Sequence, residues 1–157
     1  IIPTICFEVA YDGLMRDSTL QPGRDASILA VQTNNATFGY TAESEQQFAI
    51  SRLRAIEHGR SVVHVSTVGV SGFINPDGTY VDKTTLFTAA ARYGSPVVLT
   101  EVTVSDRLGP LPWSAAGLAF VALLALGLWL RRRTARVERA TDGPTAPVQP
   151  RRDHVVV

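Results

Sequence analysis

The stretch SEQQFAISRLRAIEHGRSVVHVS, residues 44–66, carries a helix pattern that is followed directly by a strand pattern. Apolar side chains recur at the spacing of one helix face, at Ala49, Ile50, Leu53 and Ile56. Ser44 to Gln47 fits a capping box at the start of this helix, and Gly59 offers a C-cap at its end. The valine-rich run at 61–66 then predicts a strand.

Short apolar runs on both sides of this stretch predict further strands. Upstream, residues 1–6 and 26–33 are rich in isoleucine and valine, as buried strands are. Downstream, residues 70–74 and 79–84 flank an Asn-Pro-Asp-Gly turn and predict a hairpin, and residues 97–104 are strand-like. The order of strands and helices predicts a layered α/β fold in which helices cover the sheet faces.

Residues 108–130 predict a transmembrane helix, because none of them is charged. A helix of this length can cross a hydrocarbon core of roughly 30 Å. Trp113 and Trp129 lie near its two ends, where indole rings favour the membrane interface. A buried core helix or an amphipathic surface helix is the alternative, but a core helix rarely lacks a polar face for so long and no amphipathic pattern is evident. We expect Gly109–Pro112 to form an elbow outside the regular helix.

Charge distribution sets the expected topology. The formal net charge is only +1, yet five arginines crowd residues 131–139, and such a cluster favours the cytoplasmic side of a membrane. We therefore expect residues 1–107 to form an extracytoplasmic domain and residues 131–157 to form a basic, proline-rich cytoplasmic tail that is disordered. The chain opens without an initiator methionine or a signal-peptide pattern, so we expect the natural protein to continue upstream.

Composition narrows the chemistry. A length of 157 residues with 45% apolar side chains suits one domain with a core. Cys6 is the only cysteine, which excludes an intrachain disulfide and a multi-cysteine metal site. His58 and His64 lack a second ligand at metal-binding spacing, so we predict that both are structural and that no metal is bound. No basic stripe with interleaved aromatic residues is present, which argues against nucleic-acid binding.

Two interpretations of Cys6 are open on spacing alone. It ends an apolar strand and precedes Phe7 and Glu8, a position that exposes a nucleophile and turns backbone N–H groups toward a developing oxyanion. An isolated cysteine in an apolar strand is more commonly a small buried hydrophobic residue. Choosing between these interpretations needs more than this one position.

Several segments, in order along the chain, are similar to motifs of a single family. ICFE at 5–8 is similar to a Cys-Tyr-Glu nucleophile strand, QTNNATFG at 32–39 to an Asn-Asp-Ala-Trp-Phe-Gly loop, and residues 46–60 to an Arg-x-Arg-Ala-x-Glu helix. These motifs resemble those of the apolipoprotein N-acyltransferases, a branch of the nitrilase or carbon–nitrogen hydrolase superfamily. The hairpin and the apolar helix followed by arginines come in the expected order, so the resemblance runs from Ile1 to about Arg133.

The resemblance implies the C-terminal half of a nitrilase-like α-β-β-α sandwich followed by one transmembrane helix. It implies an N-acyltransferase of the bacterial inner membrane that needs no cofactor. Its cysteine takes an acyl chain from a phospholipid as a thioester and passes the chain to the N-terminal amine of a diacylglyceryl-modified apolipoprotein. In this family a glutamate base and a lysine that helps hold the oxyanion lie upstream of the cysteine. We therefore expect these 157 residues to be inactive alone.

Site residues follow from the same motifs. The resemblance implies that Cys6 is the nucleophile, that the Phe7 backbone N–H binds the oxyanion and that Glu8 is a supporting carboxylate. The substrate-binding residues that it implies are Asn34, Asn35 and Phe38.

The chain departs from the family's pattern at several positions. Asn35 stands where aspartate is frequent, Thr37 where tryptophan is frequent, and Gln47 where a histidine often follows glutamine. The sequence STVGV at 66–70 replaces Ser-Thr-Asn-Asn-Gly. These departures leave the nucleophile strand intact and bear on substrate preference.

Two other functions stay open. One is a membrane-tethered nitrilase-type amidohydrolase, in which water resolves the thioester. The other is a non-catalytic anchored binding domain, in which Cys6 is merely packed.

The remaining cations have ordinary explanations. Arg52, Arg54 and Arg60 are predicted to form a solvated or ion-paired helix face, with Glu57 close enough in sequence to pair with Arg54 or Arg60. Lys83, the only lysine, lies downstream of Cys6 and is predicted to be a solvated charge at a strand edge.

Overall fold

The computed structural model describes residues 1–23 and 27–141, with side chains described as far as Thr134. The chain divides into two compact units, Ile1–Gly109 and Pro110–Val157. The first unit contains, in chain order, β1 (Ile2–Ile5), the 3-10 helix η1 (Cys6–Ala10), α1 (Asp12–Thr19), β2 (Leu29–Thr33), the 3-10 helix η2 (Ala36–Phe38), α2 (Glu43–His58), β3 (Val62–Ser66), β4 (Gly72–Ile74), β5 (Tyr80–Val81) and α3 (Val104–Leu108). The second unit contains α4 (Leu111–Thr141).

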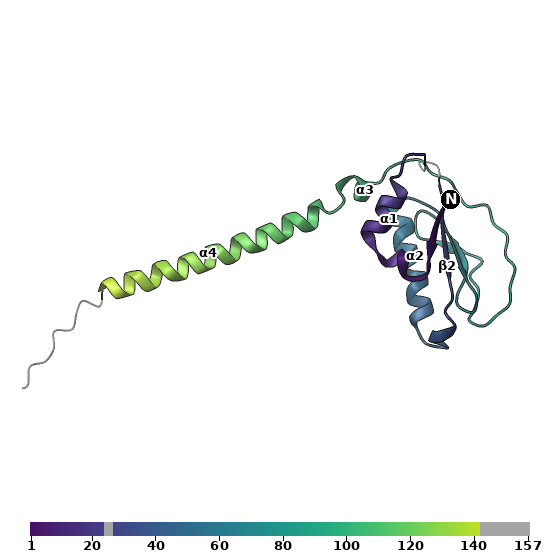
Figure 1. The fold of residues 1–157 in the computed structure, drawn as a ribbon, viewed down its shortest axis with the longest axis horizontal. Coiled ribbons are helices and arrows are strands. Elements are labelled where there is room, and N and C mark those ends of the chain that lie inside the picture. The colour runs from purple at the N-terminus through teal and green to yellow at the C-terminus, as the bar shows by residue number, and fades with distance from the viewer. Residues whose placement is uncertain (24–26, 142–157) are drawn as a thin grey trace, which may run out of the picture. The chain divides into compact units, whose positions relative to one another are not determined.

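One mixed sheet organises the first unit (Figure 1). Its strand order is β1-β2-β3-β4-β5, with β1, β2 and β3 parallel and β4 and β5 antiparallel to their neighbours. The strands predicted at 1–6, 26–33, 61–66 and 70–74 are therefore present, although residue 26 lies outside the described residues. The hairpin is confirmed too, but its return strand is short, because only Tyr80 and Val81 pair with β4. Mixed α/β is the fold class that the sequence predicts.

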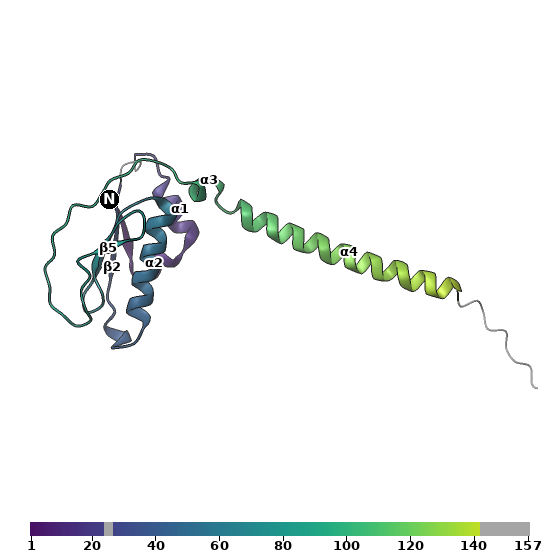
Figure 2. The same cartoon turned by 180° about the vertical axis from the view of Figure 1, so that it is seen from behind.

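Helices α1 and α2 lie on the same side of the sheet (Figures 1 and 2). Alternate strand residues point toward them, so Ile2, Leu29, Val31, Val62 and Ile74 are buried. They pack with apolar side chains from the helices and loops, namely Val9, Met15, Phe48, Ala55 and Val70. Each large side chain buried in this way stabilises the fold by about 1.5–3 kcal/mol.

Helix α2 differs from its predicted orientation. Leu53 and Ile56 of its apolar face are 64% and 53% exposed. The face that meets the sheet carries Ser44, Gln47, Phe48, Ser51, Ala55 and His58. The predicted capping box is also wrong. The Ser44 side chain is fully buried, and its hydroxyl accepts from the Val70 N–H at 3.0 Å instead of capping the helix.

The C-terminal end of α2 confirms its prediction. Gly59 has φ +59°, the left-handed conformation that glycine adopts without steric strain. A Cβ at this position would also lie 3.0 Å from Thr103 Cγ2, so a side chain here would be crowded as well as strained.

The segment between β5 and α3 is irregular, and the strand predicted at 97–104 is wrong. Its carbonyl groups accept from side chains instead of pairing in a ladder: Ser61 Oγ donates to Val97 O at 2.7 Å, and Arg60 Nη1 donates to Glu101 O at 2.9 Å. The Gly94 Cα faces the Phe73 ring, on the sheet face opposite α2. Side-chain donors thus replace the neighbouring strand that sequence reasoning supposed.

Helix α4 is an uninterrupted helix of 31 residues. It begins at Leu111 and includes Pro112, which corrects the prediction that Gly109–Pro112 lies outside regular helix. Proline is tolerated in a first turn, where its missing N–H has no intrahelical partner. The helix also continues beyond Leu130 into the basic stretch, whereas residues 142–157 lie outside the described residues.

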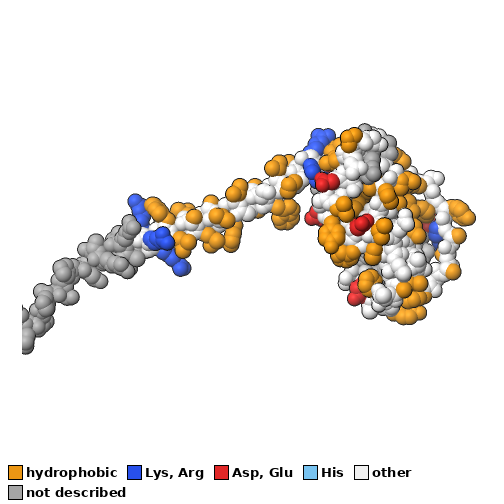
Figure 3. Space-filling view, in the orientation of Figure 1, with side chains coloured by type: hydrophobic (Ala, Val, Ile, Leu, Met, Phe, Trp, Pro, Cys, Tyr) orange, Lys and Arg blue, Asp and Glu red, His pale blue; other side chains and the backbone are white. Residues whose placement is uncertain are grey.

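The part of α4 from Leu111 to Thr134 is long and apolar enough to cross a membrane, with a mean hydropathy of 2.0. None of this part is buried by the described residues. Apolar side chains surround it along its length, and arginines follow them (Figure 3). The Arg133 guanidinium lies 4.3 Å from the centre of the Trp129 ring, which places a cation and an interfacial aromatic together near one end.

His64 gives this fold a testable pH dependence. Its ring is buried beneath α2, with Nδ1 2.8 Å from Ser51 Oγ, and burial lowers its pKa from 6.5 to about 4. Between these two values the unfolded chain binds a proton that the folded chain does not, so acid favours unfolding. We expect the free energy of unfolding to fall by roughly 3 kcal/mol as the pH drops from 6.5 to 4.

Pulse proteolysis in urea across this pH range measures the effect. The variant His64→Gln keeps a hydrogen-bonding side chain that does not titrate. In this variant, the contribution of His64 to the fall in unfolding free energy between pH 6.5 and 4 should disappear. An unchanged fall would show that His64 is not the responsible group.

Candidate active site at the carboxyl ends of the parallel strands

Three parallel strands end at the same edge of the sheet, and polar side chains gather there. Cys6 follows β1 directly, Thr33 is the last residue of β2, and Ser66 is the last residue of β3. Ligands of open α/β sheets bind at this edge, because the chain leaves each strand there and exposes side chains and backbone groups. This is where the sequence places the candidate nucleophile.

Cys6 sits in a strained turn. It is the first residue of η1 and has φ +51°, which is uncommon for a residue other than glycine. Such strain persists only where the surroundings hold it, and it clusters at functional sites. The sulfur is half-buried, so it is neither sealed in the core nor fully in solvent.

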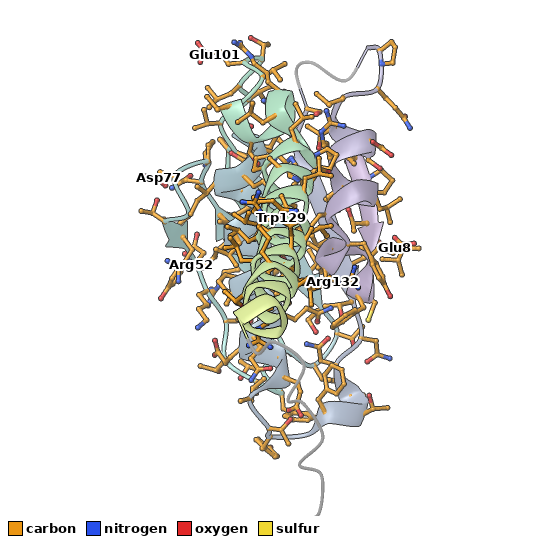
Figure 4. The ribbon with its side chains drawn as sticks, turned by 90° about the vertical axis from the view of Figure 1, so that its left-hand side faces the viewer. Glu8, Arg52, Asp77, Glu101, Trp129 and Arg132 are labelled. Atoms are coloured by element: carbon orange, nitrogen blue, oxygen red, sulfur yellow. The ribbon has the colours of Figure 1, made fainter. Side chains whose placement is uncertain are left out.

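The Glu8 carboxylate braces this turn. Its Oε2 accepts from the Ile5 N–H at 2.7 Å, which joins the end of β1 to η1. Glu8 lies on the outside of the unit (Figure 4), and Phe7 beside it is 57% exposed. Glu8 therefore holds the backbone directly before Cys6.

Two side chains that sequence reasoning did not assign to the site contact the sulfur. Thr33 Oγ1 lies 3.6 Å and Gln47 Nε2 lies 3.8 Å from Cys6 Sγ. Thr33 Oγ1 also lies 2.5 Å from Asn35 Oδ1, and Asn35 Nδ2 donates to Ser44 Oγ at 2.9 Å. A connected group of buried polar side chains therefore backs the sulfur.

The predicted substrate-binding residues divide into different environments. Asn35 is 1% exposed and belongs to the polar group just described. Asn34 is exposed, and its Oδ1 accepts from the Thr67 hydroxyl at 2.7 Å and from the Ala36 N–H at 3.1 Å. Phe38 is half-buried at the end of η2. All three follow β2 closely, so they belong to the loop that leaves the sheet beside Cys6.

A buried arginine fixes the position of η1. Arg54 Nε donates to Val9 O at 2.7 Å and its Nη2 donates to Ala10 O at 2.9 Å. The same guanidinium pairs with the carboxylates of Asp12 and Glu57. Burial works against its charge, but the hydrogen bonds and charges of these carboxylates outweigh burial and raise the Arg54 pKa.

This arrangement corrects part of one prediction. Arg54 pairs with Glu57 as expected, but its side chain is only 8% exposed, so it is not on a solvated face. Arg60 is 2% exposed and donates to the Glu101 carbonyl. Arg52 does lie at the surface near the Asp77 turn (Figure 4), where its Nε donates to Gly78 O at 2.8 Å.

Lys83 and His58 are engaged elsewhere. Lys83 Nζ lies 2.7 Å from Glu45 Oε2, so the lysine is ion-paired and not simply solvated. His58 is fully buried, with Nδ1 2.8 Å from Asp106 Oδ1 of α3. Within residues 1–23 and 27–134, no group of three or more His, Cys, Asp or Glu side chains is placed to hold a metal ion.

Two hollows of about 460 Å³ lie on the first unit, and Cys6 lines neither. One is bordered by η1 and α2, among them Ala10, Leu53 and Arg54. The other is bordered by Glu45 and by the chain from Lys83 to Leu86. Neither hollow thus provides a substrate cavity beside the sulfur.

Comparison with known proteins tests the resemblance seen in the sequence motifs. No family model matches the chain. It is 38% identical over 141 residues to the apolipoprotein N-acyltransferase of Mycolicibacterium smegmatis, covering 84% of the chain and 23% of that protein. This chain is homologous to a portion of the apolipoprotein N-acyltransferases. The resemblance inferred from its motifs is confirmed.

The chain is similar to other apolipoprotein N-acyltransferases as well. The protein of Azotobacter vinelandii is 34% identical over 150 residues, covering 95% of the chain and 27% of that protein. The protein of Ralstonia nicotianae is 32% identical over 135 residues, covering 86% of the chain and 25% of that protein. The chain thus spans about a quarter of the length of these curated relatives.

The role of Arg54 can be tested by a conservative change. Arg54→Lys keeps one positive charge but loses the planar fork that reaches two backbone carbonyls and two carboxylates. We expect it to lower the free energy of unfolding by about 2–4 kcal/mol, because buried acceptors lose their donors. Pulse proteolysis in urea measures this loss on the detergent-solubilised protein.

Arg52→Lys is the matched control, two residues away on the same helix. Its side chain is at the surface, so the expected change is within about 0.5 kcal/mol. Equal losses in the two variants would contradict a special role for the Arg54 guanidinium.

Proposed function

We propose that the protein to which this chain belongs transfers an acyl chain from a phospholipid, through a thioester on Cys6, to the N-terminal amine of a diacylglyceryl-modified apolipoprotein. The observation that carries this proposal is the placement of Cys6. In a chain homologous to apolipoprotein N-acyltransferases, the only cysteine stands at a strained turn at the carboxyl edge of parallel strands. Cys6 is half-buried, so it is not sealed in the core.

The proposed reaction has two halves. A base takes the proton of the Cys6 thiol, and the thiolate attacks the ester carbonyl carbon of the phospholipid. The ester C–O bond breaks, and the base returns its proton to the oxygen of the leaving lysophospholipid. The amine of the apolipoprotein then attacks the thioester, its proton passes to a base, and the C–S bond breaks to return the thiolate. Splitting the transfer in this way replaces one difficult step by two easier ones.

We propose that the base and the oxyanion-binding lysine come from a part of the protein outside this chain, as the resemblance implies. Lys83 is paired with Glu45, and the Glu8 carboxylate is bonded to the Ile5 N–H. Among the described residues, the side chains that hydrogen-bond to the sulfur are those of Thr33 and Gln47, and neither is a strong base. These 157 residues should therefore be inactive alone.

The sandwich architecture is likewise a proposal, and the sheet supplies its support. Ile5, Gln32 and Val65 lie in register on one face, where Ile5 is 65% and Val65 is 50% exposed. In addition, β1 is an edge strand of the described sheet. We propose that a second sheet covers this face and that another part of the protein pairs with β1, which would also build walls around Cys6.

The apolar helix favours function at a membrane. Its length and hydropathy suit a bilayer span, and a phospholipid donor is found at that surface. From the arginines after Leu130 we propose that the C-terminal end is cytoplasmic, that the first unit is extracytoplasmic, and that the membrane is the bacterial inner membrane. The partners would then be the phospholipid donor, the apolipoprotein acceptor and the membrane itself.

The acyl-enzyme can be trapped directly. We expect the complete protein to form an acyl adduct on Cys6 when it is incubated with labelled phospholipid and no acceptor. Hydroxylamine should remove this adduct, because it cleaves thioesters. Mass spectrometry of the Cys6 peptide locates the adduct. Cys6→Ala should form none, provided that its proteolysis pattern shows an intact fold.

The outcomes separate the competing functions. A labelled adduct that passes to a lipoprotein amine supports acyl transfer. Release of free fatty acid or ammonia despite an available acceptor would favour an amidohydrolase. A Cys6 that never becomes labelled would leave an anchored binding domain and end the acyl-enzyme proposal.

A further inference from the structure

A chain of buried polar side chains runs from the backbone of the segment before β4 to the Cys6 sulfur. The Val70 N–H donates to Ser44 Oγ at 3.0 Å, and Ser44 Oγ accepts from Asn35 Nδ2 at 2.9 Å. Asn35 Oδ1 and Gln47 Oε1 lie 2.5 Å and 3.0 Å from Thr33 Oγ1. Thr33 and Gln47 then contact the sulfur.

The polar side chains that link Val70 to the sulfur are deeply buried. Ser44, Asn35 and Gln47 are at most 3% exposed, and Thr33 is 7% exposed. Burying an amide or a hydroxyl is costly unless its hydrogen bonds are made inside the protein. The Gln47 amide contacts Thr33 and Cys6, so the sulfur is one of the partners that compensate for its burial.

The number of protons available for hydrogen bonds in this group depends on whether the sulfur is protonated. The Thr33 hydroxyl has one proton but three acceptors within reach, namely Asn35 Oδ1, Gln47 Oε1 and Cys6 Sγ. A deprotonated sulfur needs donors, which the Gln47 NH₂ supplies at 3.8 Å. The Thr33 hydroxyl can turn its proton to the same sulfur at 3.6 Å, so both side chains can donate to a thiolate.

The packing around the chain leaves no spare room. A Cβ on Gly69 would collide with Ser44 Oγ and would approach Asn35 Nδ2 to 2.8 Å. The backbone of Gly69 therefore presses against the middle of the polar chain and holds it in place. Ser44 and Asn35, the two polar side chains of this group that Gly69 approaches, therefore have little room to move.

We propose that Gln47 and Thr33 are hydrogen-bonding residues of the nucleophile: they hold the Cys6 sulfur in position and stabilise its thiolate. Asn35 and Ser44 act through them as positioning residues. This inference rests on the proposed function, because it gives a role to the thiolate that the acyl transfer uses.

The test is the pH dependence of Cys6 alkylation by iodoacetamide in the complete protein, followed by mass spectrometry of the Cys6 peptide. The thiolate is the reacting form, so the midpoint of the pH–rate profile reports how well it is stabilised. We expect Gln47→Met and Thr33→Val, which keep the volume but remove the donor, to move this midpoint upward by about one pH unit. Thr33→Ser, which restores the hydroxyl, should return the midpoint toward its original value.

Ser51→Ala is the matched control, because Ser51 is fully buried on the same face of α2 but bonds to His64. It should leave the midpoint unchanged. Gln47→Met and Thr33→Val profiles that keep the original midpoint, even at a lower rate, would overturn the proposal, since a rate change alone reports access. A shift that Thr33→Ser fails to reverse would also overturn it for Thr33.

Alkylation needs no acyl donor, so the two proposals can fail separately. Shifted midpoints in a protein that never forms the acyl adduct would support the contacts to the sulfur and reject the acyl transfer. An adduct that forms normally while the midpoints stay unchanged would reject only the role of Gln47 and Thr33.

Discussion

The geometry of the site depends on the hydrogen bonds and ion pairs of the Arg54 guanidinium. It joins α2 to the carbonyls that end η1 and to the carboxylates of Asp12 and Glu57. The turn at Cys6 is strained, so it needs such an external constraint to persist. With η1 held from one side and Glu8 bonded to Ile5 on the other, the sulfur is directed toward Thr33 and Gln47. The ion pairs and hydrogen bonds of one buried arginine thus help to fix the position of the half-buried Cys6.

Local sequence patterns predicted most of the strands and helices, but not which face of helix α2 is buried. The parallel strands, the helix that ends at Gly59 and the apolar helix from Leu111 could all be predicted, because each rests on composition or on a single turn residue. The orientation of α2 could not, because its buried face carries serines, a glutamine and a histidine. Those side chains are satisfied only by partners far away in the sequence, such as the pair Ser51 and His64.

The same limit applies to the candidate site. Cys6, Phe7 and Glu8 were found because they are contiguous and match a motif. Thr33 and Gln47 are separated from Cys6 by 27 and 41 positions, and only the folded sheet brings them to the sulfur. The one available signal was that Gln47 departs from the pattern of the family, which marked the position without explaining it. Side-chain donors to Val97 and Glu101 were equally invisible, so a strand was predicted where none forms.

The distribution of aromatic residues has a practical consequence for spectroscopy. Both tryptophans belong to α4, near the two ends of its apolar stretch, whereas all four tyrosines belong to the first unit. Within this chain, indole emission therefore comes from α4 without a contribution from the sheet. Because α4 is proposed to span a bilayer, lipids that quench at known depths would locate its two ends one at a time, in variants that keep a single tryptophan. Phenol signals would follow the other unit in the same sample.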